Sequence, residues 1–183
     1  VITHMDEDHY SGILELLEMG KIRYLGLPDV PKDETFQKIL NAAHHSETQV
    51  FFLSRGKKIE GGDISMEVIH PAKGSSLEKN AASLVLQGKL LGKKVILTAD
   101  VEKEGEEELL DQELEETDIL KAAHHGSKNS TSEDFLKMTK PKIAVISCGK
   151  ENRYGHPHKE TLERLKTTGC QIRRTDEEGA VLF

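Results

Sequence analysis

The sequence predicts an α/β protein built as a single domain over residues 1–183. Short apolar stretches typical of strands alternate with longer amphipathic stretches typical of helices along most of the chain. The chain has no low-complexity tract, linker or internal repeat at which it would divide, and 183 residues are enough for one substantial core. Aromatic residues make up only 4% and Trp is absent, so Ile, Leu, Val and Ala must build that core.

The expected elements of the first half begin and end where the apolar spacing changes or where Pro, Gly or Asp interrupts it. Phe36, Ile39 and Ala43 share one face of a helix for which Asp33 is a suitable N-cap. In order, we expect the end of a buried strand at residues 1–3, a helix over 12–17, a strand at 21–27, a helix over 33–46, a strand at 49–53, a strand that starts near 58 and a strand at 65–71.

Three histidines of this half receive a structural interpretation first. His44 and His45 end the second helix, where the helix dipole favours cationic side chains. His70 ends a strand just before Pro71, and a role in a site is the less favoured of its two interpretations.

In the second half of the chain, expected strands and helices alternate more regularly. In order, we expect a loop at residues 74–83, strands at 84–87 and 94–100, an acidic helix over 102–112, a strand at 117–123, a helix over 132–138, a strand at 142–147, a polar loop at 148–158, a helix over 158–168 and a final hairpin-like pair of strands at 170–176 and 179–183.

Composition limits the function. The formal net charge of -7 argues against a broad basic surface for nucleic acid, although bound divalent cations would reverse the potential locally. No apolar stretch approaches the ~18–20 residues of a membrane span, and no signal peptide opens the chain. The chain starts without Met in what resembles the middle of a strand, so we expect a soluble fragment of a longer protein. For Cys148 and Cys170, a disulfide and two buried free thiols remain alternatives.

The strongest signal lies in residues 3–12, THMDEDHYSG. Four metal-capable side chains fall within six residues at the expected junction of a strand and a helix: His4, Asp6, Asp8 and His9. A loop at the end of a rigid strand can direct several side chains to one point, and mixed imidazole and carboxylate ligands suit Zn, Mn or Fe. The structural alternative is a solvated acidic loop in which Asp6 or Asp8 caps the helix.

Three later strand ends are also polar. Asp100 ends an apolar strand, where a carboxylate can be a site residue or can cap the following helix. His124 and His125 follow a short buried strand, and Gly126 permits a sharp backbone turn there. His156 lies in the polar loop before the last helix.

These side chains are too many for one tetrahedral structural zinc ion. They suit two divalent cations that share a bridging carboxylate, an arrangement that stabilises both the nucleophile and the leaving oxygen in phosphoester displacement. Such a centre also hydrolyses esters and amides, so these residues alone leave the substrate open.

The motif at residues 4–9 resembles the HxHxDH signature of the metallo-β-lactamase superfamily, with Asp6 in place of the second His. That replacement, with LTAD at 97–100, AHHGS at 123–127, ISCG at 146–149 and YGHP at 154–157, is similar to one subgroup. That subgroup is the C-terminal β-lactamase-like domain of ComEC-type DNA-internalisation competence proteins. The resemblance covers most of the chain.

The resemblance implies the ligands of two divalent cations. His4 and Asp6 would hold the first cation, Asp8 and His9 the second, and Asp100 would bridge them.

His124 would complete the second cation site in preference to His125. The superfamily has another His before the strand that ends in Asp100; this chain has none there, and Asn80 is the weakest candidate in its place. An oxygen-rich set of this kind shifts the preference from Zn²⁺ towards Mn²⁺ or Mg²⁺.

The resemblance also implies a catalytic set, in which Asp8 and Asp100 act with His156, which contacts phosphate or protonates the leaving oxygen. The substrate-binding residues implied are His125, Ser127, Asn152, Tyr154 and His156.

The fold that the resemblance implies is an αβ/βα sandwich, in which two mixed sheets pack face to face with helices outside. Superfamily domains open with strands that this sequence lacks, so we expect the first N-terminal strands to be missing.

The expected function is that of a metal-dependent phosphodiesterase or nuclease acting on single-stranded DNA during uptake, with a metal-activated water as nucleophile. The alternatives are a small-molecule or cell-wall phosphoesterase, similar to a phosphorylcholine esterase, and a degenerate non-catalytic domain. The resemblance further implies a parent chain with a membrane channel, placed in the cell membrane with this domain on the extracellular side; no obligate protein partner is inferred.

Overall fold

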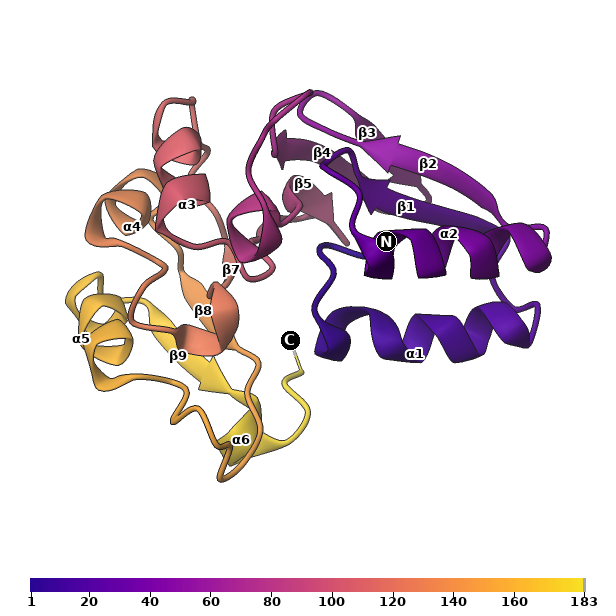
Figure 1. The fold of residues 1–183 in the computed structure, drawn as a ribbon. Coiled ribbons are helices and arrows are strands. Elements are labelled where there is room, and N and C mark those ends of the chain that lie inside the picture. The colour runs from indigo at the N-terminus through magenta and orange to yellow at the C-terminus, as the bar shows by residue number, and fades with distance from the viewer. Residues whose placement is uncertain (183) are drawn as a thin grey trace.

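The computed structural model describes residues 1–182, and its strands form two sheets (Figure 1). The smaller sheet pairs β1 (Tyr24–Pro28) in parallel with β2 (Gln49–Leu53). The larger sheet has the strand order β3-β4-β5-β6-β7-β8-β9. Its strands are β3 (Lys58–Gly61), β4 (Ile64–His70), β5 (Val85–Leu90), β6 (Lys93–Leu97), β7 (Ile119–Lys121), β8 (Ile143–Ile146) and β9 (Gln171–Arg174).

The pairing direction changes in the middle of the larger sheet. From β3 to β6 each strand runs antiparallel to its neighbour, and from β6 to β9 each runs parallel to it. The carboxyl ends of β6, β7 and β8 therefore lie at one edge, and the segments that follow them meet there. In open α/β sheets this edge is where ligands bind.

The helices cover the two outer faces of the sheets. In Figure 1, α1 (Glu7–Glu18) and α2 (Glu34–His45) run side by side along the smaller sheet, while the later helices lie on the far side of the larger one. Asp33 caps α2 by accepting a hydrogen bond from the Phe36 backbone N–H at 2.7 Å. The later helices are α3 (Lys103–Leu110), α4 (Glu133–Thr139), α5 (Lys159–Thr167) and the single-turn α6 (Thr175–Glu178), and the 3₁₀ turns are η1 (Lys79–Ala82) and η2 (His124–Gly126).

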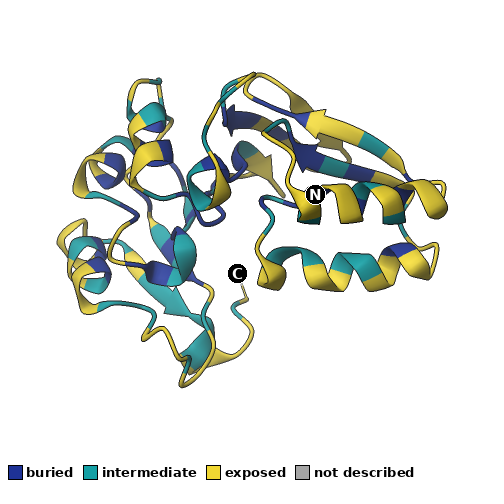
Figure 2. Ribbon diagram, in the orientation of Figure 1, coloured by how far each residue is buried: buried dark blue, intermediate teal, exposed yellow. Residues whose placement is uncertain are grey.

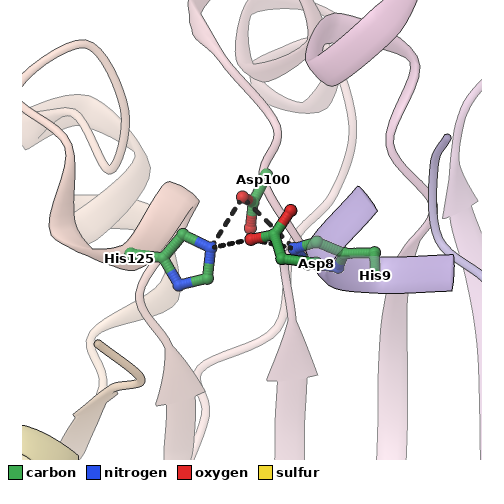
Figure 3. A group of neighbouring side chains, drawn as sticks. All are labelled: Asp8, His9, Asp100 and His125. Atoms are coloured by element: carbon green, nitrogen blue, oxygen red, sulfur yellow. Dashed lines mark ion pairs between the residues drawn. The ribbon is translucent and has the colours of Figure 1, made fainter. Parts of the chain in front are cut away.

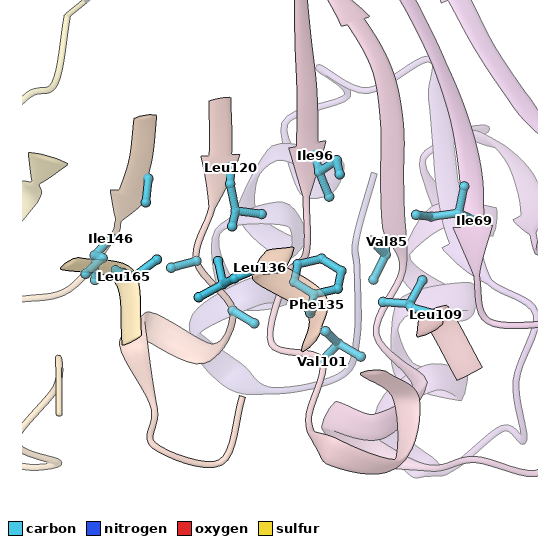
Figure 4. Close-up of a cluster of buried hydrophobic side chains, with 13 residues drawn as sticks. Ile69, Val85, Ile96, Val101, Leu109, Leu120, Phe135, Leu136, Ile146 and Leu165 are labelled. Carbon is cyan, nitrogen blue, oxygen red and sulfur yellow. The ribbon is translucent and has the colours of Figure 1, made fainter. Parts of the chain in front are cut away.

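Side chains that alternate along the strands form the two hydrophobic clusters on either side of the larger sheet. In β4, Val68 packs into the cluster between the two sheets, whereas Ile69 joins the cluster beneath the later helices. In β5, Leu86 and Val85 divide in the same way, because successive strand side chains point to opposite faces. Figure 4 shows the second of these clusters, and Figure 2 shows the dark-blue buried segments between the layers. The predicted α/β sandwich, with helices outside two sheets, is confirmed.

The start of the chain differs from its prediction. Residues 1–3 form no strand: the Ile2 N–H donates to the Gly26 carbonyl at 2.9 Å, and the Thr3 carbonyl accepts from the Leu84 N–H at 2.9 Å. Helix α1 begins at Glu7 rather than at residue 12, so the acidic motif forms the first helical turn.

The predicted C-terminal hairpin is wrong for residues 170–182, and Phe183 lies outside the described residues. Strand β9 pairs in parallel with β8, and the chain then turns into α6 instead of returning as a strand. The physical reason is local ion pairing: Arg174 holds Asp176 through two contacts of 3.0 and 2.6 Å, and the Arg173 guanidinium contacts Glu178. These contacts close a single helical turn.

Both cysteine thiols are free. The Cys148 thiol donates to the Asp176 carboxylate at 3.2 Å, and that of Cys170 to the Leu165 carbonyl at 3.4 Å. Within residues 1–182, none of the helices combines the length and the apolar character that crossing a bilayer requires.

Candidate metal centre

Four side chains from three distant segments converge at the edge where the parallel strands end (Figure 3). Asp8 and His9 come from the first turn of α1, Asp100 from the turn after β6, and His125 from η2 after β7. One potential ligand atom from each lies within 4.8 Å of the others. The parallel pairing of β6 with β7 brings the last two together, and the start of α1 supplies the first two.

The separations between these atoms are those of a site that a cation would fill. Nε2 of His125 lies 3.1 Å from Oδ2 of Asp100 and 3.3 Å from Oδ2 of Asp8. Nε2 of His9 lies 3.4 Å from the same Asp100 oxygen and 3.7 Å from the Asp8 oxygen. Two imidazoles and two carboxylates thus face a common point, and these are the donors that Zn²⁺, Mn²⁺ and Fe²⁺ accept.

The tautomer of His125 is set from outside the cluster. Its Nδ1 lies 2.6 Å from the Ser147 backbone carbonyl, and a carbonyl oxygen can only accept, so Nδ1 carries the proton. Nε2 then presents its lone pair to the cluster. This is the pattern that orients histidine ligands of metals, with the second nitrogen donating to a carbonyl or carboxylate.

The Thr3 hydroxyl contacts both His4 and His9. Its oxygen lies 3.1 Å from Nδ1 of His4 and 3.3 Å from Nδ1 of His9, so the Nε2 atoms of both rings are turned away from it. Nε2 of His4 is 3.8 Å from the Asp6 carboxylate, and the His4 and His9 rings are 4.1 Å apart. His4 and Asp6 therefore extend the cluster on one side.

Unpaired buried nitrogens test whether these residues fit cations. The Nε2 atoms of His4 and His125 are buried and make no hydrogen bond. A buried polar atom without a partner is costly, and bound cations would satisfy both. The residues therefore fit divalent metal ions: Asp8, His9, Asp100 and His125 would hold one, and His4 with Asp6 would contribute to a second.

Charges around Asp100 favour its ionised form. Burial alone would raise the pKa of this carboxyl, but the imidazoles of His125 and His9 and the ammonium of Lys121 outweigh burial and hold its pKa far below the usual range. In turn, Asp100 raises the pKa of His125 against the opposing effect of burial. Asp100 is 2% exposed, so it contributes a fixed, ionised carboxylate to the cluster.

On the His4 side of the cluster, the surroundings favour the neutral forms of the side chains. Burial, followed by the charge of His9, lowers the pKa of His4 to about 4. Burial and the neighbouring Asp8 and Asp100 carboxylates raise the pKa of Asp6. A neutral imidazole is the form that binds a metal, so His4 is ready to act as a ligand at neutral pH.

The turn that presents His125 is strained. His124, His125 and Gly126 all have left-handed φ values, of +44°, +53° and +84°. For a residue with a side chain, this conformation costs about 1–2 kcal/mol. Such strain persists where the surrounding structure imposes it, and it gathers at functional sites.

A cavity of about 620 Å³ opens over the cluster. Ligand sites commonly have volumes of ~300–1,000 Å³. The cluster and its neighbours form one side of the cavity, and the loop after β8 forms the other. The lining residues are Asp6, Glu7, Asp8, Ser11, Asp100, His124, His125, Arg153, Tyr154 and His156.

The structure exchanges the places expected for His124 and His125. His125 joins the four-residue cluster, whereas His124 lines the cavity with its Nδ1 2.9 Å from Glu102. The reason is the left-handed turn of η2, which points consecutive side chains in different directions. The geometry therefore favours His125 as the ligand and leaves His124 beside it.

Two predicted substrate-binding residues, Ser127 and Asn152, do not line the cavity and bond to neighbouring backbone groups. Ser127 is 4% exposed, its hydroxyl accepts from the Asn129 N–H at 3.3 Å, and it does not line the cavity. Asn152 closes the loop after β8: its side chain bonds the Gly149 carbonyl and both the carbonyl and the N–H of His156. Tyr154 and His156 do face the cavity.

The remaining candidates lie outside the cluster. Asn80 sits in η1, and its Oδ1 is buried without a hydrogen bond. His70 is fully buried and its Nδ1 lies 2.8 Å from the Ser83 carbonyl. His45 lies at the end of α2, where its Nδ1 is 2.7 Å from the Asn41 carbonyl.

Among the residues that contact the cluster, Thr3, Glu102 and Lys121 escaped the sequence reasoning, and so did Arg153 in the cavity wall. Thr3 directly precedes His4, and Glu102 is two residues after Asp100, so proximity to the motifs was the available signal. Lys121 ends β7 in an otherwise apolar stretch, and its ammonium lies 3.4 Å from Oδ1 of Asp100. A lysine inside a buried strand end is a signal of a nearby carboxylate.

Comparison with known proteins places this geometry in a family. The family model described as the metallo-beta-lactamase superfamily matches residues 1–150. ComE operon protein 3 of Bacillus subtilis is 38% identical over 100% of the chain and 24% of its own length. Competence protein ComA of Neisseria gonorrhoeae is 29% identical over 100% of the chain and 24% of its own length.

Among solved structures, the metallo-beta-lactamase fold protein YhfI from Bacillus subtilis has a TM-score of 0.55 and 14% identity, over 94% of this chain and 72% of that one. This likeness shows the fold. The chain spans about a quarter of the length of the curated relatives, to which it is similar from end to end. With the family model covering most of its residues, the chain belongs to the metallo-β-lactamase superfamily.

Proposed function

We propose that this chain is a metal-dependent phosphodiesterase that cuts single-stranded DNA. The observation that carries the proposal is the cluster of two imidazoles and two carboxylates beneath an open cavity, with the buried Nε2 of His125 turned into it and making no hydrogen bond. The superfamily is generally hydrolytic, and one of the relatives is by name a competence protein.

Each part of the site has a role in that reaction. The two divalent cations expected here, Mn²⁺ or Zn²⁺ and also Mg²⁺, would lower the pKa of water and neutralise charge on the phosphate. Asp100, fixed and ionised, orients the ligand set, and Asp8 faces the same point from α1. His156 stands in the cavity wall, where its ring can donate to a phosphate or to the leaving oxygen.

Metal content and cleavage test the proposal together. Protein stripped with a chelator is supplied with Mn²⁺, Mg²⁺ or Zn²⁺ in separate assays on single-stranded DNA. We expect bound metal with cleavage in at least one assay, and loss of cleavage in Asp8→Ala and Asp100→Ala.

Asp118→Ala is the matched control, because Asp118 precedes β7 at the opposite end of the strand and pairs with Lys142 on the surface. Cleavage that persists in Asp100→Ala, or that Asp118→Ala removes equally, would contradict the assignment.

A small-molecule or cell-wall phosphodiester is the second candidate, and the net charge of -7 favours it. DNA affinity depends on Lys and Arg contacts to phosphates and weakens steeply with salt. Turnover of a small phosphodiester that exceeds DNA cleavage, with little dependence on salt, would support this candidate.

The parent protein is part of the proposal. Since the relatives are about four times longer, we propose that this domain works outside the cell, attached to a membrane channel domain of the same chain. Protease accessibility of this domain on intact cells tests that arrangement, and protection from external protease would contradict it.

A further inference from the structure

A stack of side chains stands at the rim of the cavity. The Tyr154 ring lies over the His156 ring with centroids 5.9 Å apart and planes inclined by 26°. The Arg153 guanidinium carbon is 4.8 Å from the centroid of the Tyr154 ring, and Arg153 donates to the Tyr154 hydroxyl at 2.6 Å. All three residues line the cavity that contains Asp8 and Asp100.

The tyrosine of this stack is open to solvent although its surroundings are ordered. Tyr154 is 62% exposed, so the hydrophobic effect does not explain its place. Asn152 holds the loop with three hydrogen bonds to Gly149 and His156, so the ring does not have to stabilise the turn. An aromatic ring is thus presented to solvent beside the cluster, with His156 stacked against it and the Arg153 guanidinium close to it.

We propose that Tyr154, backed by His156 and flanked by Arg153, is a stacking platform for an unpaired nucleobase beside the scissile phosphodiester. The proposal rests on the proposed function and names the feature that would select its substrate. Proteins that bind single strands combine aromatic rings with cationic groups in this way, and Arg adds a cation–π contribution. A base within a duplex already has neighbours on both faces, so it cannot use the platform without leaving the stack.

The negative net charge of the chain increases the share of single-strand affinity that stacking must supply. With a net charge of -7, the protein has little capacity to gain affinity from contacts to phosphates. Stacking is neutral, and one base on one aromatic ring contributes enough to change affinity about tenfold or more. We therefore expect single-strand affinity to depend strongly on the presence of the base.

Binding assays with three labelled oligomers test the platform: oligothymidylate, an oligomer of equal length with abasic sugars, and oligothymidylate paired with its complement. Fluorescence anisotropy is measured with metal-free protein and again with Ca²⁺. Wild type should bind oligothymidylate about tenfold more tightly than either of the others. Tyr154→Ala should remove the difference, and Tyr154→Phe should keep it.

Tyr24→Ala is the matched control. Tyr24 is also 62% exposed and has an arginine beside its ring, Arg23 at 5.7 Å, but it lies on β1 and does not line the cavity. Equal binding of the thymidylate and abasic oligomers by wild type would overturn the platform, as would an equal loss in Tyr24→Ala and Tyr154→Ala.

Cleavage of the same oligomers separates this inference from the proposed function. Equal affinity for the two single strands with cleavage of both would keep the phosphodiesterase and overturn the platform. Base-dependent binding that Tyr154→Ala abolishes, without cleavage under any metal, would keep the platform and overturn the phosphodiesterase.

Discussion

The ammonium of Lys121 lies 3.4 Å from Oδ1 of Asp100, while Oδ2 of the same carboxylate faces His125 at 3.1 Å and His9 at 3.4 Å. Lys121 also donates to the Ala99 carbonyl at 2.7 Å, which fixes its position. One oxygen of Asp100 is therefore held by the protein, and the other is left for the cluster. This division sets the direction from which the carboxylate can meet a cation.

Replacing Lys121 with Met should destabilise the metal-free protein and raise its affinity for Mn²⁺. Asp100 is 2% exposed and would lose a charged partner, which costs about 1–3 kcal/mol. Loss of the neighbouring positive charge favours a cation in its place. Thermal unfolding with and without Mn²⁺ measures both effects. Lys121→Arg keeps a cationic donor and should stay near wild type; if the two variants behave alike, the contact is unimportant.

His125→Ala should weaken metal binding far more than His124→Ala. His125 belongs to the four-residue cluster, and loss of a ligand removes one coordinate bond, whereas His124 pairs with Glu102 beside the cluster. Metal retained after dialysis, measured by elemental analysis, distinguishes the two variants. A greater loss in His124→Ala would assign the ligand to that residue.

Gly126→Ala should destabilise the protein by about 2–4 kcal/mol and disturb the turn that carries His125. A Cβ at Gly126 would lie 2.6 Å from Cβ of Pro157 and 3.1 Å from its Cα, and φ there is +84°. Urea unfolding gives the change in free energy. Gly149→Ala is the control, since its nearest neighbour is Cβ of Asn152 at 3.9 Å; a similar effect in both variants would mean that crowding at Pro157 does not matter.

Acidification should destabilise the metal-free protein partly through His4. The pKa of this side chain is about 4 when folded and about 6.5 when unfolded, because burial disfavours the imidazolium. The unfolded chain therefore binds the proton first, so this contribution is full above pH 6.5 and is lost as the pH falls towards 4, by up to about 3 kcal/mol.

His4→Asn should flatten the dependence of unfolding free energy on pH between 6.5 and 4, whatever its effect on overall stability. His45→Asn, at the exposed end of α2, is the control. If unfolding of His4→Asn follows pH as steeply as wild type, His4 is not the group that titrates.

Cys148 should remain an unreactive thiol. Burial raises its pKa to about 11, and the hydrogen bond to Asp176 adds to the rise. At pH 8 almost none of it is thiolate, which is the reactive form. Alkylation followed by mass spectrometry should label Cys148 slowly and show no bridge to Cys170. Asp176→Asn should accelerate the labelling, and rapid modification of wild-type Cys148 would show that the thiol is not held in this way.

Local signals were sufficient for most elements. Asp33 and the apolar face of Phe36 and Ile39 predicted α2, because capping and helical periodicity act within a few residues. The apolar stretch at 49–53 coincides with β2. Asp8, His9 and Asp100, singled out from their places at predicted element ends, do lie together.

What the sequence could not supply depends on contacts between distant segments. The orientation of His125 rests on the Ser147 carbonyl, 22 residues away, and on the close packing of Gly126 against Pro157. The C-terminal turn depends on ion pairs of Arg174 that have no periodic signature. In residues 179–182, the strand pattern was therefore outweighed by side-chain charge.

The centre of the loop that carries Tyr154 is held by its own hydrogen bonds, which run from Asn152 to Gly149 and His156. Around that centre, Ser147, His156 and Pro157 contact the turn of His125, and Cys148 bonds to α6. The groups that would hold cations come from other segments. Base recognition and cation binding therefore rest on different segments: a different loop between Ser147 and Pro157 would change the substrate preference without changing the residues that would hold the cations.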